Sequence, residues 1–175
     1  MRRLNFSQYD GVQAAQMRRE QTARQLKKMK VIIGSDHGAV ELKETVKKVL
    51  KEEFPDVEVT DVGTNSGESV DYPDIAQKVC MPVAEGKYDR GIVLCGTGIG
   101  ISIAANKIKG IRAALCHETY TAKMSRQHNN ANVLAMGGRT TGPEIAAEIV
   151  RTWMSTEFLG GRHERRVNKI MALEK

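Results

Sequence analysis

One segment of the chain, residues 92–106, restricts the fold more than any other. Its first residues, Ile92 to Leu94, are apolar and largely β-branched, and they are followed by Cys95 and by glycines at 96, 98 and 100. A run of small and apolar residues continues to Asn106. This order predicts a buried strand, a tight turn and the start of a helix. Glycines let a backbone approach a ligand closely, and the free N–H groups of a helix start favour an anion.

The remainder of the chain repeats this alternation of short apolar runs and amphipathic stretches. Strands are expected at 31–35, 57–62, 91–95, 111–116 and 133–136. Helices are expected between them and after the last one, which is typical of a parallel α/β sheet covered on both faces. We therefore predict a Rossmann-like α/β fold with five parallel strands in the order 2-1-3-4-5.

The strand order matters because ligands bind such sheets where the order reverses, outside the carboxyl ends of the strands. In the predicted order, strands one and three are neighbours at that point. The turns at 35–38 and 95–100 are thus expected to lie side by side. A final helix over 162–175 is expected to turn Val167, Ile170 and Met171 inward.

Charge is distributed unevenly along the 175 residues, whose formal net charge is +6. Residues 1–30 hold eight of the 27 basic residues and two of the 21 acidic ones, which leaves 19 of each in the remainder. A nucleic-acid-binding domain would need a basic excess on its folded body, and this body has none. No apolar run approaches the roughly 20 residues that cross a bilayer. Three scattered cysteines form neither a disulfide framework nor a zinc pattern and suit a reducing, cytoplasmic compartment.

We divide the chain into a basic N-terminal extension, residues 1–29, and one domain, residues 30–175. The extension has few apolar residues and no sustained period. It is expected to be a disordered arm, with two alternatives left open. It is Arg-rich and acid-poor like a targeting peptide, and Met29 would also serve as a start directly before the first strand.

Each candidate site residue has an ordinary structural explanation beside the functional one. Cys95 could be a core cysteine, but it ends a strand beneath backbone N–H groups that stabilise a thiolate. Asp36 could cap a helix, with His37 in solvent, and His128 could end another helix. Arg162 and Arg166 stand four residues apart, which suggests either a solvated face or a phosphate between them.

The glycine turn itself leaves a rival function open. Dinucleotide-binding loops carry G-x-G-x-x-G, whereas here the third glycine, Gly100, comes one residue early. Glu118 stands near the position of the acidic residue that such a site requires. A nucleotide-binding or regulatory domain without catalysis is therefore the alternative to an enzyme.

Several motifs, in order, resemble one family: ribose-5-phosphate isomerase B, in the group that also holds galactose-6-phosphate isomerase. The resemblance runs from about Lys30 to the C-terminus. The motifs are Gly34-Ser35-Asp36-His37-Gly38, Ser69-Val70-Asp71-Tyr72-Pro73-Asp74, residues 95–107, Ser125-Arg126-Gln127-His128-Asn129, Gly138-Arg139 and Gly160-Gly161-Arg162-His163-x-x-Arg166.

The resemblance implies a metal-free, cofactor-free aldose–ketose isomerase of the pentose phosphate pathway. Ribose 5-phosphate and ribulose 5-phosphate would interconvert through an enediol. Cys95 matches the catalytic base, Thr97 the group that assists proton movement at the sugar oxygens, and His128 the acid/base that opens the furanose ring. One branch uses a glutamate at the position of Ile99, so this chain resembles the cysteine branch.

The resemblance also implies the residues that bind the substrate. Asp36 and Asn129 match groups that hold sugar oxygens, and the N–H groups of Gly96, Gly98 and Gly100 would stabilise the enediolate. The phosphate-binding residues would be His37, Arg139, Arg162 and Arg166, with Tyr72 and His163 lining the pocket. The loop 64–70 and the surroundings of His128 are expected to set the sugar length, with a six-carbon 6-phosphate as the alternative substrate.

The family is dimeric or tetrameric, and its pocket lies across two subunits. The resemblance therefore implies a homodimer or a dimer of dimers, with the C-terminal helix reaching over the partner. No nucleic-acid or membrane partner is expected, given the balanced charge of the body and the short apolar runs.

Overall fold

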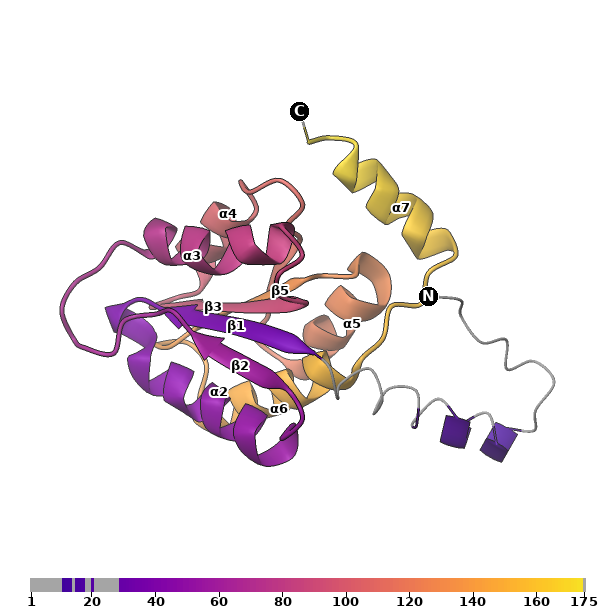
Figure 1. The fold of residues 1–175 in the computed structure, drawn as a ribbon, viewed down its shortest axis with the longest axis horizontal. Coiled ribbons are helices and arrows are strands. Elements are labelled where there is room, and N and C mark those ends of the chain that lie inside the picture. The colour runs from indigo at the N-terminus through magenta and orange to yellow at the C-terminus, as the bar shows by residue number, and fades with distance from the viewer. Residues whose placement is uncertain (1–10, 14, 18–19, 21–28, 175) are drawn as a thin grey trace.

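The computed structural model describes residues 11–13, 15–17, 20 and 29–174 (Figure 1). Most of the basic extension, residues 1–29, lies outside the described residues, so its expected disorder stays a prediction. The domain that follows contains five strands and the helices around them. The strands are β1 (Lys30–Ser35), β2 (Glu58–Asp61), β3 (Arg90–Cys95), β4 (Ala113–Leu115) and β5 (Val133–Gly137).

Helical segments follow every strand. A 3-10 turn, η1 (His37–Ala39), leads into α2 (Val40–Glu53). The others are α3 (Tyr72–Ala84), α4 (Ile99–Ala105), α5 (Thr119–Asn129), α6 (Pro143–Ser155) and α7 (Arg162–Met171). All strand pairs are parallel, so the predicted fold class is confirmed.

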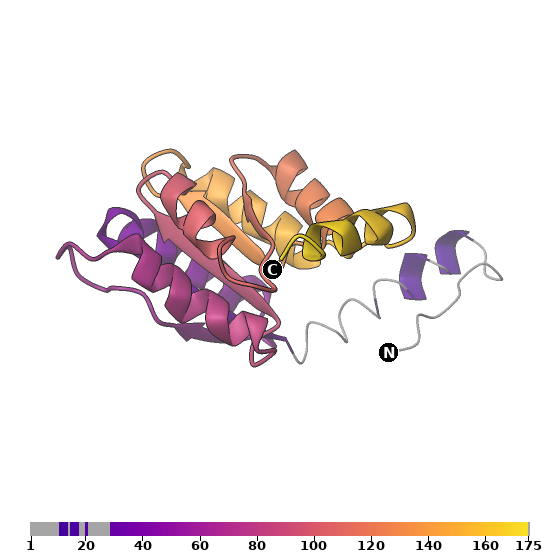
Figure 2. The same cartoon turned by 90° about the horizontal axis from the view of Figure 1, so that it is seen from above.

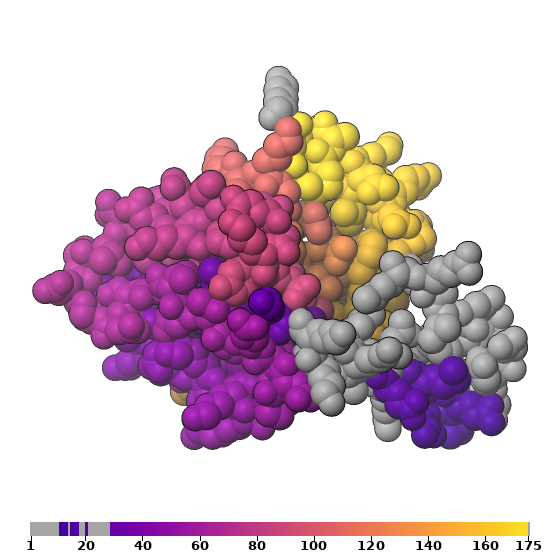
Figure 3. Space-filling model, in the orientation of Figure 1, coloured from indigo at the N-terminus to yellow at the C-terminus, as the bar shows by residue number. Residues whose placement is uncertain are grey.

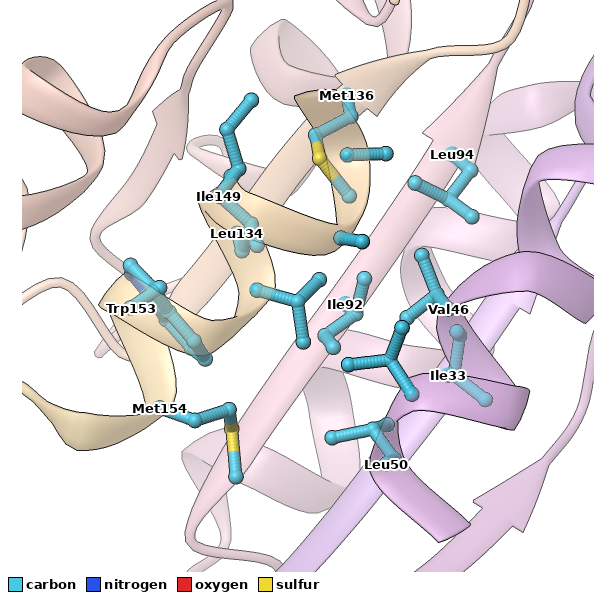
Figure 4. Close-up of a cluster of buried hydrophobic side chains, with 14 of the residues drawn as sticks. Ile33, Val46, Leu50, Ile92, Leu94, Leu134, Met136, Ile149, Trp153 and Met154 are labelled. Atoms are coloured by element: carbon cyan, nitrogen blue, oxygen red, sulfur yellow. The ribbon is translucent and has the colours of Figure 1, made fainter. Parts of the chain in front are cut away.

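The sheet lies between two layers of helices because its central strands are apolar on both faces. Alternate strand residues, such as Ile33, Ile92 and Leu134, pack against α2 and α6 in one core (Figure 4). The residues between them, such as Ile32 and Val93, pack against α3 and α4 in the other. Each turn that joins a strand to the next helix therefore lies at the rim of the domain, where the sheet and the helix layer both end.

The observed strand order is β2-β1-β3-β5-β4, so the predicted order is wrong for the last two strands. β5 is buried along its whole length, whereas the three residues of β4 are only half-buried. The more apolar strand therefore takes the central position and the short one the edge. The predicted reversal between β1 and β3 is confirmed.

The C-terminal helix α7 lies beside the main body, against α5 (Figures 1 and 2). Val167 is buried as expected, but Ile170 is 43% exposed, so its inward assignment is wrong. The reason is that only His163 and Val167 of α7 are buried, while the helix lies at the surface of the molecule, in yellow in Figure 3. None of the described helices is long and apolar enough to cross a membrane.

Candidate active site

The carboxyl ends of β1, β3 and β5 bring one set of predicted residues together, which we call the carboxyl-edge group. Asp36 follows β1, and its N–H donates to Leu94 O at 3.1 Å. The N–H of Arg139, after β5, donates to Gly96 O at 2.9 Å. The predicted meeting of the turns 35–38 and 95–100 is therefore confirmed. The members are Asp36, His37, Tyr72, the turn Cys95–Gly100 and Arg139.

Cys95 lies at the centre of this group. Its Sγ accepts a hydrogen bond from the N–H of Gly98 at 3.2 Å, a contact that stabilises a thiolate. Gly98 has φ +76° and caps α4, a conformation that glycine adopts readily. The Thr97 side chain accepts from the N–H of Ile99 at 3.3 Å, so strand end and helix start are joined by short local bonds.

The other two cysteines have no such surroundings. Burial raises the pKa of Cys80 to about 12. It also raises the pKa of Cys116, to about 11. Both thiols lie in the hydrophobic cores, so we interpret both cysteines as structural residues.

His37, which follows Asp36 in the turn after β1, and Tyr72, at the start of α3, complete the carboxyl-edge group. The N–H of Val70 donates to His37 Nδ1 at 3.3 Å, which leaves Nε2 to carry the proton of a neutral ring. A Cβ on Gly100 would lie 2.7 Å from the ring of Tyr72, so the ring packs directly on the glycine turn. Tyr72 is still 40% exposed and borders open space.

The second set of predicted residues gathers where α5 ends and α7 begins, and we call it the amino-edge group. The rings of His128 and His163 stack with centroids 4.1 Å apart. Partial burial lowers the pKa of His163, and His128, Arg162 and Arg166 lower it further. His163 is thus neutral at pH 7. The members are His128, Asn129, Arg162, His163 and Arg166.

Arg126 is a supporting residue to which the sequence assigned no role. Its Nη1 donates to Ala131 O at 2.5 Å and to Asn130 Oδ1 at 3.1 Å. Its guanidinium also lies 5.7 Å from the ring centroid of Trp153. These contacts hold the turn that follows His128. The only sign of them in the sequence is an arginine among the polar residues of the motif 125–129.

The two groups lie at opposite edges of the sheet. A helix that follows a parallel strand runs back to the amino ends, so α5 carries His128 away from Cys95. The four steps from Gly91 to Cys95 alone cover about 13 Å. Figure 1 shows the same separation, with the strand arrowheads pointing away from α7. One copy of the chain therefore does not assemble the predicted site.

The chemistry of each group is incomplete by itself. The carboxyl-edge group has a thiol, a carboxylate, one imidazole, backbone N–H groups and one arginine. The amino-edge group has two imidazoles, an amide and two arginines, but no thiol. Exposed apolar side chains accompany both groups: Ile99 and Ile103 beside the glycine turn, and Ile170 and Leu173 on the C-terminal segment. Among the described residues, no group of three or more His, Cys, Asp or Glu side chains could hold a metal ion.

Comparisons with known proteins agree on one family. The Ribose/Galactose Isomerase model matches residues 31–170. Ribose-5-phosphate isomerase B of Escherichia coli is 50% identical over 145 residues, 83% of this chain and 96% of that protein. D-erythrulose-4-phosphate isomerase of Pectobacterium atrosepticum is 46% identical over 81% of this chain and 93% of that one. The solved structure of Clostridium thermocellum ribose-5-phosphate isomerase B superposes with a TM-score of 0.80 at 55% identity, covering 83% and 97%.

Proposed function

The chain belongs to the ribose/galactose isomerase family, and from this premise we propose how its residues perform the reaction. It is an aldose–ketose isomerase that interconverts ribose 5-phosphate and ribulose 5-phosphate. Its site forms where the carboxyl-edge group of one copy meets the amino-edge group of another. The supporting observation is that the thiol and the glycine turn lie in one group, whereas His128 and two of the three arginines lie in the other.

Cys95 is the catalytic base. As a thiolate it removes the proton from C2 of the open-chain aldose, and the electron pair moves to the carbonyl oxygen at C1 to give an enediolate. The resulting thiol then returns the proton to C1, which yields the ketose. Backbone N–H groups of the glycine turn stabilise the enediolate charge, and Thr97 assists proton movement between the two oxygens.

The amino-edge group acts on the closed sugar and on the phosphate. His128 transfers the proton that opens the furanose ring, and Asn129 holds a sugar oxygen together with Asp36 of the other copy. Arg162 and Arg166 bind the phosphate with His37 and Arg139 of the other copy, because guanidinium forks match phosphate oxygens. Tyr72 and His163 line the pocket.

The first experiment is ribose 5-phosphate isomerisation by the purified chain in the presence of EDTA, beside Cys95→Ala. Turnover that survives EDTA and vanishes in the variant is the expected result. Equal turnover by both proteins would remove Cys95 from the mechanism. Loss of turnover in EDTA would overturn the metal-free reaction.

We also place the enzyme in the cytoplasm, which its three free cysteines support.

A four-carbon sugar phosphate is a second candidate substrate, because a relative at 46% identity is named D-erythrulose-4-phosphate isomerase. In a tetrose 4-phosphate the phosphate occupies the oxygen that would close a furanose ring. Such a substrate needs no ring opening, so its turnover should survive His128→Asn while ribose 5-phosphate turnover falls. Comparing kcat/KM for the two sugars in the native chain decides which is preferred.

A further inference from the structure

The most deeply buried charge in the described domain belongs to Lys43, in the first turn of α2. Its side chain is 0% exposed. A buried ammonium needs acceptors for its three N–H groups. Lys43 Nζ finds them at Thr64 O (2.7 Å), Asn65 Oδ1 (2.6 Å) and Asp61 Oδ2 (3.0 Å). All three lie at the end of β2 or in the segment just after it.

That segment, residues 62–71, is the long loop between β2 and α3 (Figure 1). It begins beside the candidate site, where the N–H of Thr64 donates to Ser35 O at 3.0 Å. It ends there as well, where the N–H of Val70 donates to His37 Nδ1 at 3.3 Å. Residues 65–69 between these points are exposed. The loop is therefore fixed at its two ends, by Lys43 and by His37.

We propose that Lys43 is a positioning residue that holds the 62–71 loop against the site and thereby sets which sugar lengths are accepted. This inference rests on the proposed function, since it concerns how the same site selects its substrate. Lys43 itself touches no substrate. It fixes Thr64 and Asn65 at the start of the loop. The loop then places the Val70 N–H against Nδ1 of His37. Because Nδ1 accepts this bond, Nε2–H of His37 remains available to donate to an anion.

A purely structural lysine would have a different effect. Replacing Lys43 by methionine fills similar volume without a charge. Asp61 keeps its bonds from Lys47 (2.9 Å) and from the Gly63 N–H (3.0 Å), so no buried carboxylate is left alone. If Lys43 only stabilised the fold, Lys43→Met would change the midpoint of unfolding and leave substrate selection intact.

Lys47 provides the matched control. Both lysines bond Asp61, but the contacts of Lys47 are with Asp61 and Glu44 and not with the loop. Lys43→Met is expected to raise KM for ribose 5-phosphate about tenfold with kcat within about threefold. The preference for ribose 5-phosphate over a six-carbon aldose 6-phosphate is expected to fall. Lys47→Met should leave KM and preference unchanged.

Asn65→Ala tests the same link without disturbing the core, because Asn65 is exposed. It should raise KM in the same direction, and the double variant with Lys43→Met should lose less than the two effects added together. Unchanged KM and preference in Lys43→Met, or equal effects from Lys47→Met, would overturn the inference. A native chain that isomerises no sugar phosphate would instead contradict the proposed function.

Discussion

At the scale of single residues, the three cysteines have the same chemistry in different environments. Burial raises the pKa of Cys80 to about 12 and that of Cys116 to about 11, so both remain thiols at pH 8. Cys95 instead receives the Gly98 N–H at 3.2 Å. We expect iodoacetamide at pH 8 to alkylate Cys95 first, with protection by ribose 5-phosphate, as peptide mass spectrometry would show. Equally rapid labelling of Cys116 would contradict this.

Asp61 gives a residue-scale prediction about pH. Burial alone would raise its pKa, but hydrogen bonds from Lys47, Lys43 and the Gly63 N–H outweigh that and lower it. A carboxylate with a depressed folded-state pKa contributes stability above its unfolded pKa of about 4, and the contribution is lost as pH falls through the folded value. Asp61→Asn is therefore expected to cost about 2 kcal/mol at pH 7 and progressively less below pH 4.

Urea unfolding at several pH values measures this difference. Glu58→Gln is the control, because Glu58 is exposed and its pair with Lys30 spans 3.4 Å at the surface. Such a pair contributes less than about 1 kcal/mol. A cost for Asp61→Asn that stays constant down to pH 2 would show that the depressed pKa is not its source.

At the scale of elements, the turn between β3 and α4 permits little variation. Gly98 has φ +76°, and a Cβ there would lie 2.6 Å from Leu115 Cδ1 and 2.7 Å from the carbonyl carbon of Met136. Backbone atoms cannot move aside as a flexible side chain can. We expect Gly98→Ala to destabilise the chain by about 2–4 kcal/mol and to reduce kcat severely.

Thermal unfolding and isomerase kinetics check this prediction. Gly142→Ala is the control, because Gly142 has φ −66° and nothing lies within 4 Å of a Cβ at this position. It should leave both measurements nearly unchanged. Full activity of Gly98→Ala would mean that the turn tolerates another backbone path and does not fix Cys95.

The elements themselves were largely predictable, since apolar runs and turn residues mark them in the chain. The order of β4 and β5 was not, because the prediction placed neighbours in sequence side by side. A signal did exist: Arg112 interrupts the apolar run before β4, whereas Val133 to Met136 is uninterrupted. Ile170 was misassigned because periodicity shows which side of a helix is apolar but not what covers it.

At the scale of the whole molecule, the family resemblance already implied a pocket across two subunits, and the topology places the predicted site residues at two opposite edges of the sheet. The direction of α5 already implied that His128 lies at the amino edge and Cys95 at the carboxyl edge. What no single chain could reveal is how the edges of two copies meet. That assembly is a proposal, and it can be tested directly.

Subunit complementation is the test. In a two-fold dimer, each of the two sites combines the carboxyl edge of one copy with the amino edge of the other. A mixed dimer of Cys95→Ala and His128→Asn therefore contains one site in which both edges are native. Random mixing should therefore restore about a quarter of native activity from two inactive proteins. Mixing Cys95→Ala with Thr97→Ala is the control, since both changes lie at one edge and no native site forms. Failure to restore activity in the first mixture would contradict the shared site.

The central position of β5 has a consequence for how the substrate range of this molecule can change in evolution. Asp36 and Arg139 follow β1 and β5, and Cys95 is the last residue of β3, the strand between them. Neighbouring strands lie about 4.8 Å apart, so the ends of β1 and β5 lie about 10 Å apart, with the end of β3 midway between them. Backbone hydrogen bonds between the strands set these distances, and substitutions in the hydrophobic core do not change them. Selection for longer or shorter sugars must therefore act on the flanking loops, where change leaves the sheet intact.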